Sequence, residues 1–417
     1  MLLALAGKVG SDLQSIILRR PKQFAELIRQ LKRGARRQVV TVFHWGCLTE
    51  GDQMITLERN SLIFRFPDVH QGAKSAIQFQ RTLRIPDDGK HYPLPPGLGT
   101  LPLRHVEDFA NRVPEAWRER AGVMMPLYQA EAMWISFSKG WRSVGGYPCA
   151  IKVAAGKINA ISGKSWKPEL DGSDRDYIVV PEQPWLDGFC VAKDVIRQFV
   201  AMPLGSGYSV EEQITGEPEH GGLQIIVYPM RKSHYEALLQ RRDRASYMGA
   251  LGERRRTSVA RAAAAPARAM GLAAGGRMKQ QIYADPHGLD AWDQSVSSRC
   301  FVTLVDAVQW HKITGETLPT RPPTAADYTR AGLPWFNYYA SDLETLGGAQ
   351  ALAVVKSVGE IAAEKGDQVL GSDGEVDPGT IINLRPGKPP HSTARPVRES
   401  KLLRSRKGTD RVEEKEA

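Results

Sequence analysis

The sequence predicts a β-rich α+β fold, built as an antiparallel sandwich or distorted barrel with flanking helices. Two observations lead to this class. Many short segments rich in β-branched and aromatic residues, each closed by turn residues, follow one another between residues 39 and 308. These segments do not alternate with regular helical patterns, which disfavours a doubly wound parallel sheet. We therefore expect one β-rich body over residues 39–340 of the 417-residue chain.

The expected strands share a period of two in their apolar residues, or form short buried apolar runs. They span residues 39–44, 53–59, 62–66, 79–85, 133–137, 149–154, 157–161, 177–180, 188–191, 195–202, 222–228 and 300–308. The short connection at residues 192–194 predicts a tight hairpin between two of them.

Helices are expected where apolar residues recur every three or four positions. The basic N-terminal arm, residues 1–38, contains such a pattern over 11–33, which Pro21 divides into two helices. Residues 106–120, interrupted by Pro114, and residues 235–245 are also expected to be helical. A C-terminal helix is expected over residues 341–365, where Ser341 and Glu344 match a capping box.

The charge is unevenly distributed along the chain. Residues 1–38, 241–280 and 384–417 carry net charges of +7, +8 and +5, whereas the whole chain carries +10. The remainder is therefore acidic, with a net charge of −10. An anionic partner, either nucleic acid or a lipid surface, would bind these basic segments weakly and in a salt-dependent way.

Two segments have a composition that is unusual for a packed core. Within the basic segment 241–280, residues 257–276 are rich in Ala, Gly and Arg, which predicts a mobile insertion or a loop with a weak helix. Residues 366–417 are rich in Gly and Pro and then highly charged, and they lack aromatic residues. We expect this tail to be disordered, because it offers too little apolar surface to offset the entropy lost on ordering.

Composition also restricts the class of protein. No run of eighteen apolar residues is present, so no transmembrane segment is expected. The apolar start lacks a charged leading region, which argues against a secretory signal. The four cysteines are far apart and form no Cys-x-x-Cys motif, which indicates a reducing, cytoplasmic environment and no zinc site.

The stretch at residues 181–188 is the first candidate for chemistry. Glu182 and Asp187 flank Trp185 on a connection bounded by prolines. A carboxyl group beside an indole can acquire the raised pKa that a general acid needs. The alternative is a turn in which Trp185 anchors the loop against the sheet, and this interpretation predicts a substantially buried Trp185.

His220 and Asp306 are two further candidates for acid–base chemistry. His220 lies beside Glu217 and Glu219, but no second histidine lies at ligand spacing, so a loop that enters a strand explains it better. Asp306 and His311 are five residues apart, and on a strand this spacing places them on opposite faces. No metal site and no cofactor are expected, since the common nucleotide, nucleophile and metal motifs are missing from the sequence.

Arg254, Arg255 and Arg256 precede Thr257 and Ser258. The basic run is a candidate binding site for anions, and phosphate on the hydroxyl pair would cancel part of the local charge. Trp185 is the other candidate binding residue, because aromatic side chains are enriched at recognition surfaces.

Several stretches resemble a family of microbial proteins of unassigned function. They are MPLYQAEAMWISF (125–137), YPCAIKVAAGKINAISG (147–163), YIVVPEQPWLDG (177–188), RQFVAMPLGSGYSVEEQ (197–213), HGGLQIIVYP (220–229), MGLAAGGRMKQQIYADPHGLDAWD (270–293) and TLPTRPPTAADYTRAGLPWFNYY (317–339). The resemblance spans about residues 125–340 and implies no activity, cofactor or site. It does imply that residues 270–293 belong to the body.

These observations favour a cytoplasmic binding or assembly protein with an unidentified protein partner. Two alternatives stay open. One is an enzyme that uses Glu182, Asp187, His220 or Asp306 for acid–base chemistry, and the other is a protein that binds anionic surfaces through its basic arms. A single cleft that gathers these carboxylates and the histidine would favour the enzyme, whereas their dispersal would favour binding.

Overall fold

Antiparallel strands dominate the part of the chain that the structure describes. The computed structural model describes residues 54–137, 146–173, 175–246, 269–317, 321–338, 343–367 and 375–384. Contacts along the chain assign Ile55–Ala417 to one compact unit and Met1–Met54 to another. The N-terminal arm, the strand expected at residues 39–44 and Arg254–Arg256 lie outside the described residues.

Every strand that was expected within the described residues is present, and the structure adds strands that were not expected. In chain order they are β1 (Ile55–Leu57), β2 (Leu62–Arg65), β3 (Lys74–Thr82), β4 (His91–Tyr92), β5 (Gly97–Thr100), β6 (Arg104–His105), β7 (Val123–Leu127), β8 (Ala132–Ser136) and β9 (Cys149–Ala155). They continue with β10 (Ile158–Asn159), β11 (Ile178–Val180), β12 (Trp185–Leu186), β13 (Gly188–Ala192), β14 (Val195–Pro203), β15 (Leu223–Pro229), β16 (Ala269–Lys279) and β17 (Ser298–Asp306).

Strand pairing follows an order that differs from the order in the sequence. A continuous series of pairs runs β1–β2–β3–β8–β14–β16–β17–β15–β9–β11. All of these pairs are antiparallel, whereas β4 joins β16 and β7 joins β17 in parallel. Within the described residues no pairing joins the two ends of the series. The fold is therefore β-rich α+β, as predicted, and the sheet is not a closed barrel.

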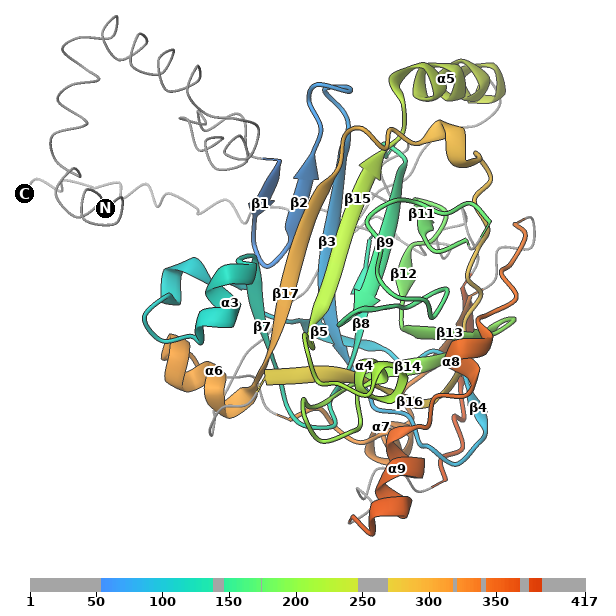
Figure 1. The fold of residues 1–417 in the computed structure, drawn as a ribbon. Coiled ribbons are helices and arrows are strands. Elements are labelled where there is room, and N and C mark those ends of the chain that lie inside the picture. Colours follow the sequence, from blue (N-terminus) through green and yellow to red (C-terminus); the bar gives the residue numbers. More distant parts are fainter. Residues whose placement is uncertain are drawn as a thin grey trace, which may run out of the picture. The chain divides into compact units, whose positions relative to one another are not determined.

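Short helices surround the sheet (Figure 1). They are α3 (Glu115–Arg120), α4 (Val210–Thr215), α5 (Lys232–Ser246), α6 (Ala307–Thr314), α7 (Ala325–Arg330), α8 (Gln350–Ala353) and α9 (Val358–Lys365), with 3-10 turns at η2 (Glu107–Phe109) and η3 (Leu289–Ala291). Strands β17, β15 and β9 run alongside one another, whereas β14 and β16 run across them (Figure 1). Helices α4, α8 and α9 lie at the end where β14 and β16 cross (Figure 1).

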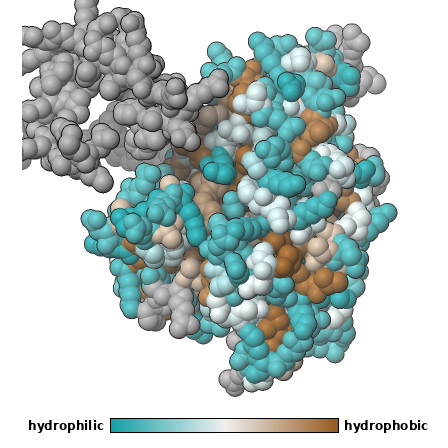
Figure 2. All heavy atoms as spheres, in the orientation of Figure 1, coloured by the Kyte–Doolittle hydropathy of each residue, from teal (hydrophilic) through white to brown (hydrophobic). Residues whose placement is uncertain are grey.

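The core fills the spaces between these layers. Alternation in β3 directs Ile77 and Phe79 inward and leaves Gln78 and Gln80 half-buried on the other face. One cluster joins β7 and β17 to α3 and α6, and a second joins β8, β14 and β16 to α9. On the surface, hydrophilic side chains predominate, and apolar patches are visible over α4 and α8 (Figure 2), where Ile214 and Val354 are exposed.

The insertion or loop expected over residues 257–276 is wrong at its C-terminal end, because the long strand β16 (Ala269–Lys279) begins there. This strand pairs with β14 over almost its whole length. Its small residues gave a weak strand signal, since Gly and Ala are depleted in strands. The packing explains them: a Cβ on Gly276 would lie 2.3 Å from the carbonyl oxygen of Pro86. Residues 270–293 thus belong to the body.

The expected helix over residues 341–365 is also wrong. The described residues 343–349 are not helical, and α8 and α9 are separate short helices. Gly348 has a left-handed φ of +79°, and a Cβ there would lie 2.4 Å from the backbone of Ala192. The capping box that begins α9 consists of Ser357 and Glu360, and not of Ser341 and Glu344.

Part of the C-terminal tail is ordered, contrary to the expectation for residues 366–417. Residues 381–384 form β19 (Ile381–Leu384), which pairs in parallel with β18 (Trp335–Tyr338). The backbone of Phe336 in turn exchanges two hydrogen bonds with Leu94 of the body. No helix in the described ranges is long and apolar enough to cross a membrane.

Candidate recognition surface

One face of the main sheet carries two tryptophans beside uncharged polar side chains, and Tyr338 of the separate β18–β19 sheet packs against one of them. The register places Gln80 opposite Trp134 and Gln78 opposite Ser136, and it places Ser136 opposite Trp185. Residues that lie directly opposite each other share a face, so these side chains form two adjacent rows. We call the following six half-buried residues the aromatic platform: Gln78, Gln80, Thr100, Trp134, Trp185 and Tyr338.

Ring contacts join the three aromatic residues of the platform. The ring centroids of Trp134 and Trp185 are 6.3 Å apart, with an angle of 67° between the rings. The centroids of Trp185 and Tyr338 are 4.7 Å apart, with an angle of 57°. Such tilted pairs are favourable and hold the rings in fixed orientations. The three rings therefore form a rigid, twisted surface.

Amide and hydroxyl groups border the rings. The side-chain amide of Gln80 donates to the hydroxyl of Thr100 at 2.9 Å, and that of Gln78 donates to the hydroxyl of Ser61 at 2.8 Å. These bonds fix the amide planes, while the amide oxygens and remaining N–H groups keep capacity for further hydrogen bonds. The platform thus combines preorganised ring faces with oriented polar groups.

Hydrogen bonds within the loop at residues 181–187 fix the position of Trp185. The buried side chain of Gln183 donates to the carbonyl of Trp185 at 2.9 Å and accepts from the backbone N–H of Tyr283 at 3.0 Å. We expected a substantially buried Trp185, and the side chain is of intermediate exposure, mostly covered but not fully buried. Pairing of β12 with β8 anchors the backbone of the loop, so the indole stays partly available.

Asp187 lies buried beside Trp185. Its carboxylate accepts hydrogen bonds from the indole of Trp185 and from the side-chain amide of Gln280, the latter at 2.7 Å. Burial raises the pKa of Asp187 to about 7, although these two bonds oppose the rise. The predicted raised pKa is thus present, but the carboxyl group orients Trp185 and lies away from solvent.

We predict that Asp187→Asn changes how stability depends on pH. The folded pKa lies above the unfolded value of about 4, so the stabilising contribution of Asp187 is complete below about pH 4 and is lost as pH rises to about 7. The variant lacks this loss. The free energy of unfolding of the variant, relative to that of the wild type, should therefore rise by up to about 4 kcal/mol between pH 4 and pH 7.5. Urea unfolding at several pH values measures this difference.

The slope of the free energy of unfolding against pH separates the titration of Asp187 from a general loss of stability caused by the substitution. Rearranged hydrogen bonds around the substituted side chain would change the free energy of unfolding by the same amount at every pH. Glu364→Gln, at an exposed pair on α9, serves as the control and should follow the wild-type profile. A difference between Asp187→Asn and the wild type that stays constant from pH 4 to pH 7.5 would contradict the prediction.

His220 has a structural role in the loop before β15. Its backbone N–H and that of Gly221 donate to the buried carboxylate of Glu211 at 3.1 and 2.7 Å, and the N–H of Lys157 does so at 3.0 Å. Burial, followed by the charge of Arg120, lowers the pKa of His220. The imidazole is therefore neutral at pH 7, and Glu211 serves as a hub for three backbone amides.

Glu182 contacts a histidine that the sequence did not single out. Its carboxylate lies 3.5 Å from Nε2 of His287, and both side chains are largely buried. Asp285 supports this histidine by accepting from its backbone N–H at 2.7 Å, and it also accepts from the indole of Trp292 at 2.7 Å. The sequence signal for this site is the Asp-x-His spacing of Asp285 and His287 around Pro286. It lies within the stretch 270–293, which was interpreted only as part of the body.

Asp306 ends β17 and caps α6, and His311 lies within that helix and not on the strand. The side chain of Asp306 accepts from the N–H of Val308 at 2.9 Å, as a helix N-cap does. Burial raises its pKa, and the N–H groups of the first helical turn oppose this. His311 contacts the carbonyl of Glu316, so the two proposed partners are engaged with different groups.

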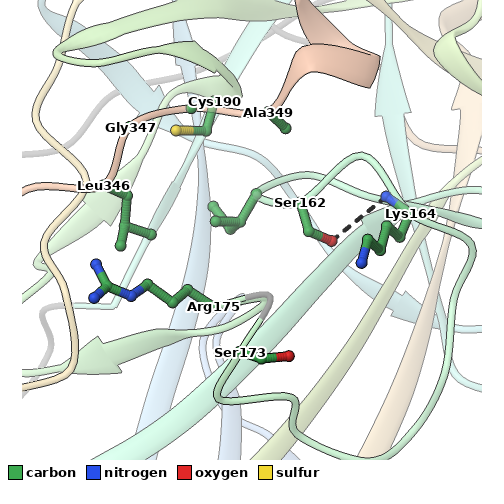
Figure 3. Close-up of a pocket in the computed structure, with 10 residues that line it drawn as sticks. Ser162, Lys164, Ser173, Arg175, Cys190, Leu346, Gly347 and Ala349 are labelled. Carbon is green, nitrogen blue, oxygen red and sulfur yellow. Dashed lines mark hydrogen bonds between the residues drawn. The ribbon is translucent and has the colours of Figure 1, made fainter.

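Two adjacent hollows lie elsewhere, between the loops at residues 161–175 and 344–349. The larger, about 280 Å³, is lined by Ile161, Ser162, Lys164, Ser173, Arg175, Cys190, Leu346, Gly347, Gly348 and Ala349. Lys164 and Arg175 lie at its opposite ends (Figure 3), and burial raises the pKa of Cys190 to about 12. The second, about 260 Å³, shares Arg175 and Leu346 with the first. Neither is lined by Glu182, Asp187, His220 or Asp306.

The described part of the chain contains no group of three His, Cys, Asp or Glu side chains that could hold a metal ion. No protein-family model matches the chain, and no curated protein or solved structure is significantly similar to it. The arrangement of its own residues is therefore the basis for a functional assignment.

Proposed function

We propose that this chain is a binding protein and that the aromatic platform is its recognition surface. The observation that carries the proposal is the pair Trp134 and Trp185, which stand half-buried on one sheet face with their rings locked together. Partly exposed, preorganised aromatic side chains provide large contact area at little cost in conformational entropy, which is typical of recognition surfaces.

The distribution of the acid–base candidates favours binding over catalysis. Asp187 supports Trp185, His220 belongs to a loop organised by Glu211, and Asp306 caps α6. Glu182 has its own partner in His287. Asp187, His220 and Asp306 thus have structural roles on three separate segments, whereas acid–base catalysis by these candidates needs two of them around one substrate cavity.

Apolar residues next to the platform enlarge the surface that a partner could contact. Tyr338 of the platform ends β18 and pairs with Leu384 of β19. Leu384, Ile381 and Ile382 are all exposed. Exposed apolar groups beside an aromatic cluster are typical of interaction surfaces.

A cytoplasmic location and weak polyanion binding through the basic arms complete the proposal. The first rests on the widely spaced cysteines, and the second on the net charges of +7 and +5 in residues 1–38 and 384–417. The arms would add salt-dependent attraction to the contact that the platform makes.

The platform can be tested without knowing the ligand. We expect the wild-type protein, incubated with extract of its own cells and examined by native mass spectrometry, to carry a non-covalent adduct. The double variant Trp134→Ala/Tyr338→Ala should lose that adduct, because it removes two of the three ring faces. Circular dichroism and thermal unfolding would verify that the variant is folded.

Trp166→Ala provides the matched control. Trp166 is also a half-buried tryptophan, but it lies over Lys152 on another part of the body. This variant should keep the adduct. An adduct that survives in the folded double variant would overturn the proposal, and loss of an adduct through Glu182→Gln instead would redirect attention to the pair of Glu182 and His287.

A further inference from the structure

We infer that the ligand of the aromatic platform is a neutral glycan chain; this inference rests on the proposed function. The first ground is chemical composition. The six side chains of the platform are two tryptophans, one tyrosine, two glutamines and one threonine, and none carries a formal charge. Sugar rings present C–H faces that pack on aromatic rings and hydroxyl groups that exchange hydrogen bonds with amides. Both kinds of partner are present here.

The second ground is the pairing of the strands that carry the platform. Strand β8 pairs with β3 along one edge and with β14 and β12 along the other. Strand β3 pairs with β8 on one side and with β2 and β5 on the other. A peptide that joins a sheet needs an open strand edge for backbone hydrogen bonds. The edges of β3 and β8 are therefore occupied, so a ligand that lies over Gln78, Gln80 and Trp134 contacts side chains of the face.

The third ground is electrostatic. Proteins that bind single-stranded nucleic acid also use aromatic faces, but they combine them with a positively charged groove. The platform has rings without such cations among its members. Its amides are already oriented by Thr100 and Ser61, which suits an uncharged ligand that offers many hydroxyl groups. A neutral oligosaccharide meets these conditions better than an RNA does.

The two rows give the site its extent. One row holds Gln80 beside Trp134, and the other holds Gln78 in line with Trp185. Rows two residues apart along a strand are separated by about 7 Å. Each row offers one indole and one amide, and the rings are inclined by 67° to each other. The site should therefore contact at least two successive sugar rings of a chain that bends between them.

The test is titration of the purified full-length protein with uncharged hexasaccharides of glucose, xylose, mannose and galactose, followed by calorimetry. We expect at least one to bind, with an affinity that changes little as salt is raised. Trp134→Ala and Trp185→Ala should each weaken binding at least about tenfold. Gln80→Ala should weaken it less, and Trp166→Ala should leave it unchanged.

The outcomes distinguish the glycan inference from the proposed function. If no neutral hexasaccharide binds, yet Trp134→Ala/Tyr338→Ala loses the adduct seen by native mass spectrometry, the platform binds something else and the glycan inference is wrong. If a hexasaccharide binds equally to wild type and to both tryptophan variants, the site lies elsewhere and the inference is also wrong. Binding that disappears as salt rises would point to the basic arms instead.

Discussion

Replacing Lys152 by alanine should lower the free energy of unfolding by about 3–5 kcal/mol, because it leaves a buried carboxylate without its cation. Lys152 lies in β9 with only 1% of its surface exposed, and its ammonium group lies 2.5 Å from the carboxylate of Asp176. The same ammonium group donates to the carbonyl of Glu169 and lies over the ring of Trp166. Chemical denaturation at pH 7 measures the loss.

A matched pair on the surface provides the control for this prediction. Lys356 and Glu364 form an ion pair at 2.6 Å, but about half of each side chain is exposed. Lys356→Ala should therefore cost less than about 1 kcal/mol. If Lys152→Ala and Lys356→Ala destabilise the protein equally, the buried pair does not have the energetic role assigned to it. Lys152→Met, which keeps the volume but not the charge, should still leave Asp176 unpaired and remain strongly destabilising.

Trp292→Ala should also destabilise the protein by about 3–5 kcal/mol, mainly by opening a cavity in the core. The ring is fully buried against His287, and its N–H donates to Asp285 at 2.7 Å. Trp292→Phe keeps much of the volume but removes that hydrogen bond, so we expect a smaller loss of about 1–3 kcal/mol. Urea unfolding of both variants separates the two contributions.

Val354→Ala is the control for Trp292, since Val354 is 70% exposed and its truncation should change stability by less than about 0.5 kcal/mol. Equal losses for the alanine and phenylalanine variants of Trp292 would show that the hydrogen bond to Asp285, and not packing, dominates. A stability unchanged in both would contradict the assignment of Trp292 to the core.

Local pattern was sufficient to predict most of the longer strands, but it missed several short ones and two longer ones, β7 and β16. Alternation identifies β3, because its buried and half-buried residues follow the pleat, whereas β14 is a continuous buried run. It missed β16, whose Gly and Ala residues allow close approach to Pro86 and Val200. It also missed β7, where Pro126 argues against a strand but is accommodated in a parallel pair with β17.

The platform could be predicted only in part. Trp185 was a candidate binding residue because it is an aromatic side chain on a connection that begins with prolines. Trp134 and Tyr338 join it through the pairing of strands that are distant in the sequence, and periodicity within one strand does not reveal which strand pairs with it or in which register. For the same reason the contact between Glu182 and His287 could not be predicted, since it depends on how two loops meet.

The order of strands in the sheet has a consequence for how the chain is made. Strand β14 has its main partner in β16, which begins roughly 65 residues after β14 ends. At synthesis rates of about 5–20 residues per second, β14 must wait for several seconds with that edge open. Strand β15 waits similarly for β17. The β14 edge stays open until residue 279 has been synthesised and the β15 edge until residue 306, and chaperones that cover such edges should be needed until then.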